Sequence, residues 1–187
     1  MPIESRMQET VTTYHNAAKR YEEKMMEMDL YHDTYDQFCS LVARRGAHIF
    51  EITTGPGNVT RYMGVKRPDF RISGIDLAPN MIDLARKNYP QGDFEVMDCR
   101  SIGCIHRTFD GVMCGFCAPY LSKAELKALI EDVANLLEPS GVFYLSTMED
   151  DNEKSGFETT SFSDGERVYV LLSSGGLFDG LFDGSRF

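Results

Sequence analysis

The pattern of hydrophobic and polar positions predicts a helical N-terminal part. From residue 5 to about residue 28, apolar side chains recur every three or four positions, which is the spacing of one helical face. A second helix is predicted to begin at Asp33 or Thr34, whose short polar side chains can cap a helix, and to end at Gly46. We expect residues 1–46 to form a helical entry, or cap, to the rest of the chain.

Beyond this entry, short apolar runs bounded by turn residues alternate with segments of helical periodicity. Pro79 can occupy the first turn of one helix, and Ser122 with Glu125 has the form of a capping box ahead of an apolar stripe. Strands are predicted over residues 48–52, 71–75, 94–97, 109–113 and 142–145, and helices over residues 58–63, 79–87 and 122–137.

This alternation predicts an α/β fold. Strands followed by helices form right-handed βαβ units, which build a doubly wound, mostly parallel sheet. The strand over residues 142–145 is apolar on both faces, as expected of a buried parallel strand. In such a sheet, ligands bind at the carboxyl ends of the strands. We therefore expect residues 47–147 to form a cofactor-binding core.

The C-terminal part has weaker periodicity. Residues 149–165 are acidic and are predicted to form a loop, and residues 167–172 are predicted to form a last strand. The tetrapeptide Leu-Phe-Asp-Gly occurs at residues 177–180 and again at 181–184, but two copies are too few for a repeat protein. We expect residues 148–187 to be irregular, with a partly disordered end.

The composition indicates one domain, over residues 1–187, with a core of its own. The chain has 187 residues, of which 42% are apolar. No apolar run reaches the about 18 residues of a membrane-spanning helix, and the N-terminus lacks the apolar core of a secretory signal. We therefore expect a soluble, cytoplasmic protein without a membrane partner.

Cysteine content and charge narrow the chemistry further. Five cysteines, an odd number, favour reduced thiols in a chain without an export signal. Cys114 and Cys117 have the spacing of a zinc or redox pair, but no second pair completes four ligands, so we expect buried thiols and no metal. The formal net charge of −10, with dispersed basic residues, disfavours a nucleic-acid partner.

Acidic residues near the ends of three successive predicted strands indicate a nucleotide-like ligand. The first strand carries Glu51 and runs into a turn with glycines, where a missing Cβ lets the backbone approach a ligand. Asp76 can accept hydrogen bonds from both hydroxyls of a ribose, and Asp98 can accept one beside an adenine. Each residue alone is also typical of an ordinary turn or helix cap. The three together with the turn favour a binding site.

The same residues separate two classes of nucleotide fold. A dinucleotide-binding turn requires a third glycine, where this chain has Thr60, and Glu51 would face a pyrophosphate unfavourably. A cofactor with an adenosine and a positive charge but no phosphate fits better. A nucleotide-dependent oxidoreductase is therefore the least favoured hypothesis.

Five ordered segments resemble class I S-adenosylmethionine-dependent methyltransferases. The resemblance extends from about residue 49 to residue 145 and keeps the order and spacing of the family's motifs. It implies a Rossmann-like methyltransferase fold, S-adenosyl-L-methionine as the cofactor, and transfer of its methyl group to a small-molecule acceptor. The segments are residues 49–58, 74–85, 98–99, 109–114 and 136–142.

The resemblance also implies roles for residues around the methionine part of the cofactor. Glu51 would hold the turn and reach the methionine amino group through water or backbone. The backbone at Thr53, Gly55 and Gly57 would line the methionine part. Tyr21 resembles an aromatic residue that closes over the cofactor, although packing on its own helical face explains it equally well.

A second group of residues would hold the adenosine part. Asp76 would accept hydrogen bonds from the ribose hydroxyls, while Leu77 and Met81 would pack on the adenine or simply belong to the core. Asp98 would accept a hydrogen bond from the adenine amino group, and Cys99 would offer its backbone N–H.

The reacting end of the site is less defined by the sequence. Cys114 and Phe116 would lie near the sulfonium. A hydroxyl acceptor requires a base, for which His15, His32 and Tyr35 are candidates, but each is more typical of a surface or packing residue. We assign no catalytic residue, and the acceptor cannot be read from the sequence.

Two departures from the family leave an alternative open. The family has glycine where this chain has Thr53, which demands a backbone conformation unusual for a β-branched residue. The C-terminal hairpin is expected to be truncated, which would expose a sheet edge and favour a homo-oligomer. The alternative hypothesis is a non-catalytic module that binds S-adenosylmethionine.

Overall fold

A parallel sheet lies at the centre of the computed structural model, which describes residues 3–148 and 150–172. The sheet has five strands in the order β3-β2-β1-β4-β5, and every neighbouring pair is parallel. This confirms the predicted fold class. The strands are β1 (His48–Ile52), β2 (Arg71–Asp76), β3 (Asp93–Val96), β4 (Phe109–Cys114) and β5 (Leu137–Leu145).

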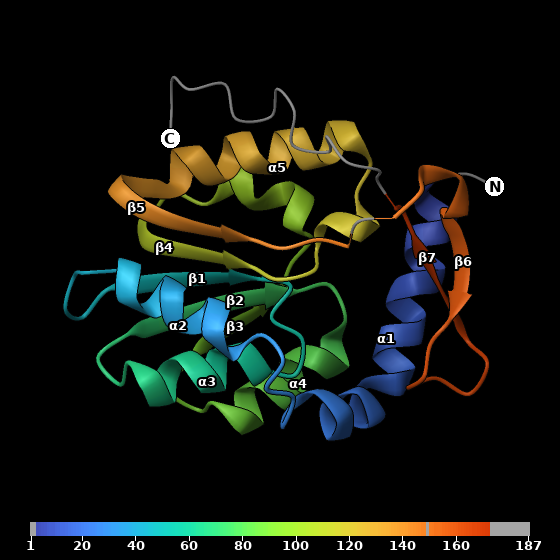
Figure 1. The fold of residues 1–187 in the computed structure, drawn as a ribbon, viewed down its shortest axis with the longest axis horizontal. Helices are drawn as coiled ribbons and strands as arrows, with labels where there is room; N and C mark the ends of the chain where they lie inside the picture. The colour runs from blue at the N-terminus through green and yellow to red at the C-terminus, as the bar shows by residue number, and fades with distance from the viewer. Residues whose placement is uncertain (1–2, 149, 173–187) are drawn as a thin grey trace.

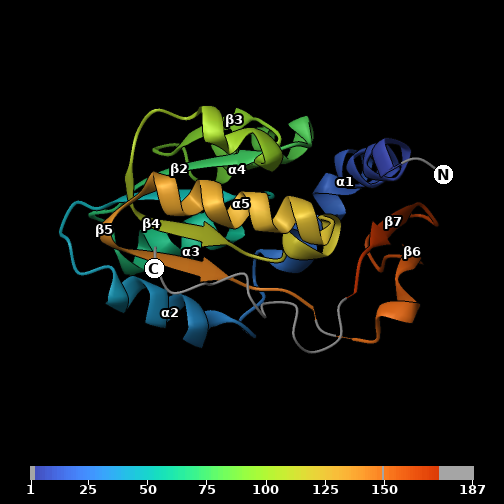
Figure 2. The ribbon, with the colours of Figure 1, turned by 90° about the horizontal axis from the view of Figure 1, so that it is seen from above.

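Helices cover both faces of the sheet. One apolar cluster joins α2, α3 and α4 to one face, and a second joins α5 and the 3-10 helix η1 to the other face (Figure 2). The capping box of Ser122 and Glu125 begins α5 as predicted. The helices are α1 (Ile3–Met25), α2 (His32–Leu41), α3 (Asn58–Lys66), α4 (Pro79–Asn88), α5 (Lys123–Leu136), and the 3-10 helices η1 (Cys99–Cys104), η2 (Ala118–Tyr120) and η3 (Asn152–Lys154).

Helix α1 lies beyond the carboxyl ends of the strands, next to an antiparallel hairpin of β6 (Gly156–Thr159) and β7 (Arg167–Val170) (Figure 1). Thr13 Oγ1 donates a hydrogen bond to the Arg167 carbonyl at 2.7 Å, and the Tyr169 N–H donates to Thr10 Oγ1 at 2.9 Å. Segments from opposite ends of the chain therefore form one layer across the edge of the sheet where ligands bind.

Helix α2 differs from its predicted bounds. It ends at Leu41, and Gly46 instead lies in a turn with φ +70° before β1. The Arg67 guanidinium donates hydrogen bonds to the carbonyls of Cys39 and Val42, both at 2.8 Å. In a longer helix these carbonyls would instead accept hydrogen bonds from backbone N–H groups. At the other end Tyr31 is the N-cap, without a side-chain cap.

The C-terminal part also corrects the sequence-based predictions. The predicted loop over residues 149–165 contains β6, because pairing with β7 and packing near α1 stabilise a strand that local sequence does not specify. Strand β5 begins at Leu137 and shifts register near Gly111, so residues 139–141 form an irregularity within a strand. The repeated tetrapeptides lie outside the described residues.

Strand β5 is also less buried than predicted. Its residues are half-buried or exposed, because among the described residues no strand pairs with its outer edge. Within that same part of the chain, each helix is too short or too polar to cross a membrane. The expected cytoplasmic location and the homo-oligomer stay predictions.

Candidate active site

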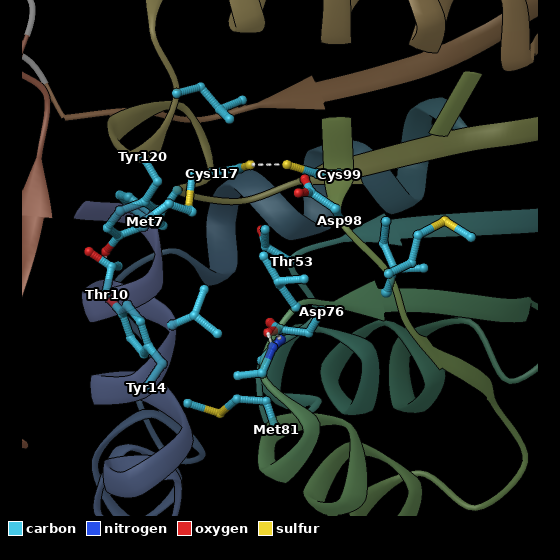
Figure 3. A pocket seen from close by; sticks show the side chains of 18 of the residues that line it. Met7, Thr10, Tyr14, Thr53, Asp76, Met81, Asp98, Cys99, Cys117 and Tyr120 are labelled. Carbon is cyan, nitrogen blue, oxygen red and sulfur yellow. Dashed lines mark hydrogen bonds between the residues drawn. The ribbon is translucent and has the colours of Figure 1, made fainter. Parts of the chain in front are cut away.

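A cleft lies between the carboxyl ends of the strands and α1 (Figure 3), with an empty volume of about 850 Å³ that includes space open to solvent. Most of the residues implied by the family resemblance line this cleft, although they come from α1, the ends of four strands and α4. They are Tyr21, Thr53, Gly55, Asp76, Leu77, Met81, Asp98, Cys99 and Phe116.

Asp76 connects two of the strand ends that form the cleft. Its Oδ2 atom accepts a hydrogen bond from the Gly55 N–H at 3.0 Å, and its Oδ1 atom accepts one from the Ala78 N–H at 2.8 Å. Burial raises the pKa of this carboxyl above its usual value, although the backbone donors oppose the shift. Each carboxylate oxygen has two lone pairs, so both keep capacity for a ligand hydroxyl.

Asp98 follows β3 and faces the cleft with a different set of partners. Its carboxylate receives hydrogen bonds from Arg100 Nη2 at 2.6 Å and from Arg100 Nε at 3.0 Å. Burial acts to raise the pKa of Asp98, but the Arg100 bonds outweigh it and hold the pKa below its usual value. Arg100 also contacts Glu125 at 3.1 Å, so a ligand of Asp98 must share the carboxylate with a fixed cation.

Two residues at the ends of β1 and β4 adopt the left-handed backbone region. Thr53 has φ +59° and Phe116 has φ +57°, which is costly for side chains with a Cβ and for a β-branched one above all. Thr53 Oγ1 donates a hydrogen bond to the Ile52 carbonyl at 2.6 Å, and the Phe116 N–H donates to Ser146 Oγ at 3.0 Å. The unusual conformation inferred for Thr53 is therefore present.

Glu51 does not line the cleft. It lies within β1 rather than at its end, is 2% exposed, and accepts a hydrogen bond from Thr60 Oγ1. Burial raises the pKa of Glu51 to about 7, and the charge of Asp76 adds to the shift. Thr60, which replaces the third glycine of a dinucleotide turn, thus contributes the donor for this carboxylate.

Gly57 and Cys114 also lie outside the cleft lining. A Cβ on Gly57, whose φ is +84°, would come within 3.1 Å of Ala85 Cα, so the glycine permits the close approach of α4. Cys114 is fully buried in the apolar cluster beneath α5. Both residues therefore shape the fold beneath the cleft.

Helix α1 and the segment after β4 supply lining residues that the sequence reasoning missed. Met7, Thr10 and Tyr14 point into the cleft opposite Asp76, and Tyr120 faces them from η2 (Figure 3). The hydroxyl oxygens of Tyr14 and Tyr120 lie 2.5 Å apart in a hydrogen bond. The apolar face of α1 was a visible signal, but the sequence does not indicate which surface that face covers.

Tyr21 occupies a place in this aromatic wall next to the glycine turn. Its ring packs edge-on against Tyr14 with centroids 5.6 Å apart, and it packs against Phe162 at 5.0 Å. A Cβ on Gly55 would lie 3.8 Å from Tyr21 Cε1. Tyr21 thus both packs on its helical face and borders the cleft.

The three candidate bases do not line the cleft. His15 accepts a hydrogen bond from the Asn80 N–H at 3.4 Å, and His32 stacks on Tyr62 with centroids 4.0 Å apart. Tyr35 is 6% exposed and packs against aromatic neighbours. The described residues also hold no group of three or more His, Cys, Asp or Glu side chains that could bind a metal.

A family comparison identifies the class of protein that this fold and cleft define. Residues 49–141 match a family model described as a methyltransferase domain. The chain belongs to the class I S-adenosylmethionine-dependent methyltransferases.

The curated relatives align with this chain over only part of their own length. The chain is 25% identical over 139 residues to a demethylmenaquinone methyltransferase of Thermotoga maritima, an alignment that covers 74% of this chain and 59% of the relative. It is 29% identical over 97 residues to putative methyltransferase 235L of Invertebrate iridescent virus 6, covering 52% of this chain and 36% of the relative. The chain thus spans about half the length of the relatives it matches.

Solved structures share the fold. The complex of DhpI with SAH aligns with a TM-score of 0.70 at 19% identity, covering 94% of this chain and 85% of that one. SAM-bound CalS10, an amino pentose methyltransferase from Micromonospora echinaspora, aligns with a TM-score of 0.67 at 21% identity, covering 89% and 85%. At these identities the likeness supports the architecture alone.

Proposed function

We propose that this chain transfers a methyl group from S-adenosyl-L-methionine to a small-molecule acceptor. The observation that carries the proposal is the convergence of Asp76, Asp98 and the Gly55 turn on one cleft within the fold of this family. Two acids and several apolar side chains line the cleft, which lies at the edge of the sheet where ligands of doubly wound folds bind.

The donor set of the cleft fits the adenosine part of this cofactor. Asp76 would receive the ribose hydroxyls on the lone pairs that Gly55 and Ala78 leave free. Leu77 and Met81 would provide an apolar surface for the adenine, and Asp98 with the backbone of Cys99 would bind its polar edge.

The methionine part would lie against the backbone of Thr53 and Gly55, with Tyr21 beside them and Phe116 near the sulfur. Glu51 would act on this part only through the turn, since it does not line the cleft. Gly57 and Cys114 would act in the same indirect way, by supporting α4 and the buried end of β4.

When bound, the cofactor would supply a methyl group on a positively charged sulfur, and an acceptor that attacks the methyl carbon would displace the sulfur as a neutral thioether. The residues of this chain then orient the two reactants and exclude water, which can provide most of the acceleration for such a displacement. Helix α1 closes one side with Met7 and Tyr14, and the Tyr14–Tyr120 hydrogen bond ties it to the segment after β4. No side chain is assigned as a base.

A small-molecule acceptor is supported by the relatives. Their names refer to demethylmenaquinone, to ubiquinone biosynthesis and to an amino pentose. The acceptor of this chain belongs to the same broad class in our proposal, and nucleic acid stays disfavoured by the net charge of −10.

We further propose that the entry (1–46), the core (47–147) and the C-terminal part (148–187) work as one domain, because α1 and β7 share hydrogen bonds.

Calorimetric titration with S-adenosylhomocysteine tests cofactor binding. The wild-type protein is expected to bind, and Asp76→Ala is expected to lose at least about tenfold in affinity, since it removes a buried acceptor. Asp83→Ala is the matched control, because Asp83 lies on α4 with its side chain 72% exposed. Folded wild-type protein that does not bind, or equal affinities in all three proteins, would contradict the proposal.

The alternative is a non-catalytic module that binds the cofactor. Two features favour it: the left-handed backbone of Thr53 and the hydrogen bonds between Arg100 and Asp98. Both are expected to lower the affinity for the cofactor. Transfer of labelled methyl groups to a panel of small amines, phenols and quinols separates the two hypotheses. Methyl transfer that Asp76→Ala abolishes supports the enzyme. Tight cofactor binding without methyl transfer to any of these compounds supports the non-catalytic module.

A further inference from the structure

Two cysteines whose thiols have no role in the proposed reaction lie in contact inside the cleft. Cys99 begins η1 after β3, and Cys117 precedes η2 after β4, yet their Sγ atoms are 3.7 Å apart (Figure 3). Both residues line the cleft. The contact therefore joins the segment after Asp98 to the segment after Phe116, which form neighbouring parts of the cleft wall.

The surroundings of the pair allow a covalent bond. A disulfide has a sulfur separation of about 2.05 Å, so the two Sγ atoms must approach by less than about 2 Å. Both cysteines stand where a strand gives way to a short 3-10 helix, so the move involves connecting segments rather than the sheet. Cys99 is partly exposed and Cys117 is 1% exposed, which makes Cys99 the thiol that an oxidant reaches first.

We propose that Cys99 and Cys117 are a redox modification site: they form a reversible disulfide that weakens cofactor binding at the adenine end of the cleft. The oxidant is a low-molecular-weight disulfide of the glutathione type. The Cys99 thiolate attacks one of its sulfurs, forms a mixed disulfide and releases one thiol; the Cys117 thiolate then attacks the Cys99 sulfur of the mixed disulfide, forms the Cys99–Cys117 bond and releases the second thiol. The protein pair loses two electrons, the small disulfide gains them, and the two protons end on the released thiols.

The environment of the thiols sets the pH dependence of this exchange. Hydrogen bonding between the two thiols, burial and the charge of Asp98 together raise the pKa of Cys99, and Arg100 opposes them. The neighbouring Cys114 thiol, first of several causes, raises the pKa of Cys117. Because the thiolate is the attacking species, exchange is slow near neutral pH and speeds up as the pH rises.

The consequence for the cofactor rests on the proposed function. Bond formation draws the Cys99 backbone toward Cys117 and displaces the neighbouring Asp98, which are the two groups assigned to the adenine edge. We expect the oxidised protein to bind S-adenosylhomocysteine about tenfold more weakly than the reduced protein, within the usual range of coupling between sites. By linkage, saturating S-adenosylhomocysteine must oppose disulfide formation by the same factor.

Mass spectrometry after incubation with oxidised glutathione tests the bond separately from the cofactor. The expected product has lost two hydrogen atoms and links the tryptic peptides 88–100 and 108–123, and fragmentation distinguishes Cys117 from Cys114. A reducing agent is expected to restore both the mass and the affinity. Stable glutathione adducts without the linked peptides, or a linkage within peptide 108–123, would overturn the proposal.

Matched variants connect the bond to cofactor binding. Cys99→Ser and Cys117→Ser are each expected to remove the effect of oxidation on affinity, while Cys104→Ser, which changes the exposed cysteine of the same 3-10 helix, keeps it. If the disulfide forms but the affinity for S-adenosylhomocysteine is unchanged, the proposal that the disulfide weakens cofactor binding is refuted. Reduced, folded wild-type protein that fails to bind refutes the proposed function instead, and the linked peptides still report on the bond.

Discussion

The carboxylate of Asp76 accepts a hydrogen bond from the Gly55 N–H at 3.0 Å, so the acid that ends β2 holds the turn that follows β1. The second oxygen accepts from the Ala78 N–H at the start of α4. One side chain thus fixes two backbone segments and faces the cleft that both segments border. Residues that are distant in sequence are coupled here through a single buried group.

This arrangement predicts a specific result for Asp76→Asn. The amide keeps the shape of the carboxyl group but offers one acceptor oxygen, so one of the two N–H groups would face an amide donor. We expect the free energy of unfolding to fall by about 1–3 kcal/mol, because a buried donor loses its partner. Chemical denaturation measures this, with the exposed Asp83→Asn as control; equal stabilities of the two variants would rule out the bridging role.

The buried Glu51 predicts a pH dependence of stability. Its pKa is about 7 in the folded protein against an ordinary 4.5, mainly because burial disfavours the charge. Since the folded state holds the proton more tightly, the contribution of Glu51 to stability is full below about pH 4.5 and is lost as the pH rises through 7.

We therefore expect the free energy of unfolding of Glu51→Gln to rise relative to that of the wild type as the pH increases from about 4.5 to about 7. The difference reaches up to about 3 kcal/mol and stays constant at higher pH. Urea denaturation at a series of pH values measures the difference. Glu131→Gln serves as control, because that side chain is 59% exposed on α5. Parallel curves for Glu51→Gln and the wild type would show that Glu51 does not titrate in this range.

The left-handed backbone of Thr53 predicts an unusual tolerance to glycine. The strain at φ +59°, on the order of 1 kcal/mol or more, is relieved in Thr53→Gly and offsets the entropy that a flexible glycine loses on folding. We expect a change in unfolding free energy below about 1 kcal/mol.

Thr54→Gly is the matched comparison for that variant. Thr54 is 1% exposed, has no left-handed conformation and shares a hydrogen bond of 3.0 Å with Thr60, so its replacement is expected to cost about 1–3 kcal/mol. Thermal denaturation of both variants tests the difference. An equal loss at the two positions would mean that Thr53 carries no strain.

Gly57 and Gly46 separate backbone conformation from close packing. Both glycines have positive φ, at +84° and +70°, but only at Gly57 would a Cβ approach the Ala85 backbone, whereas nothing lies within 4 Å at Gly46. We expect Gly46→Ala to cost about 1–2 kcal/mol from conformation alone. Gly57→Ala is expected to cost about 1–3 kcal/mol more from overpacking, as measured by chemical denaturation, and a smaller loss at Gly57 would contradict this packing.

The elements of the core were predictable because their signals are local. The strand over residues 48–52 has the predicted bounds, and α5 begins at the predicted capping box, since turn residues and apolar periodicity act within a few positions. Asp76 was also found from its place at the end of an apolar run. Its position relative to Gly55 follows from the parallel pairing of β1 with β2.

Glu51 marks the limit of such reasoning. Strand side chains alternate between the two faces of a sheet, and a shift of one residue exchanges those faces. The sequence placed an acid near the end of β1, but the fold directs it toward Thr60 beneath the cleft. Orientation of this kind depends on packing against α3.

The sequence by itself determined the order of strands and helices in the core and the family to which they belong, because short-range patterning and ordered motifs are written along the chain. Only the tertiary structure decided which side chains share the cleft. Helix α1 and the β6–β7 hairpin meet across more than a hundred residues, and the Cys99–Cys117 contact joins the ends of two strands. Such contacts form only when the sheet brings distant segments together, so no local pattern encodes them.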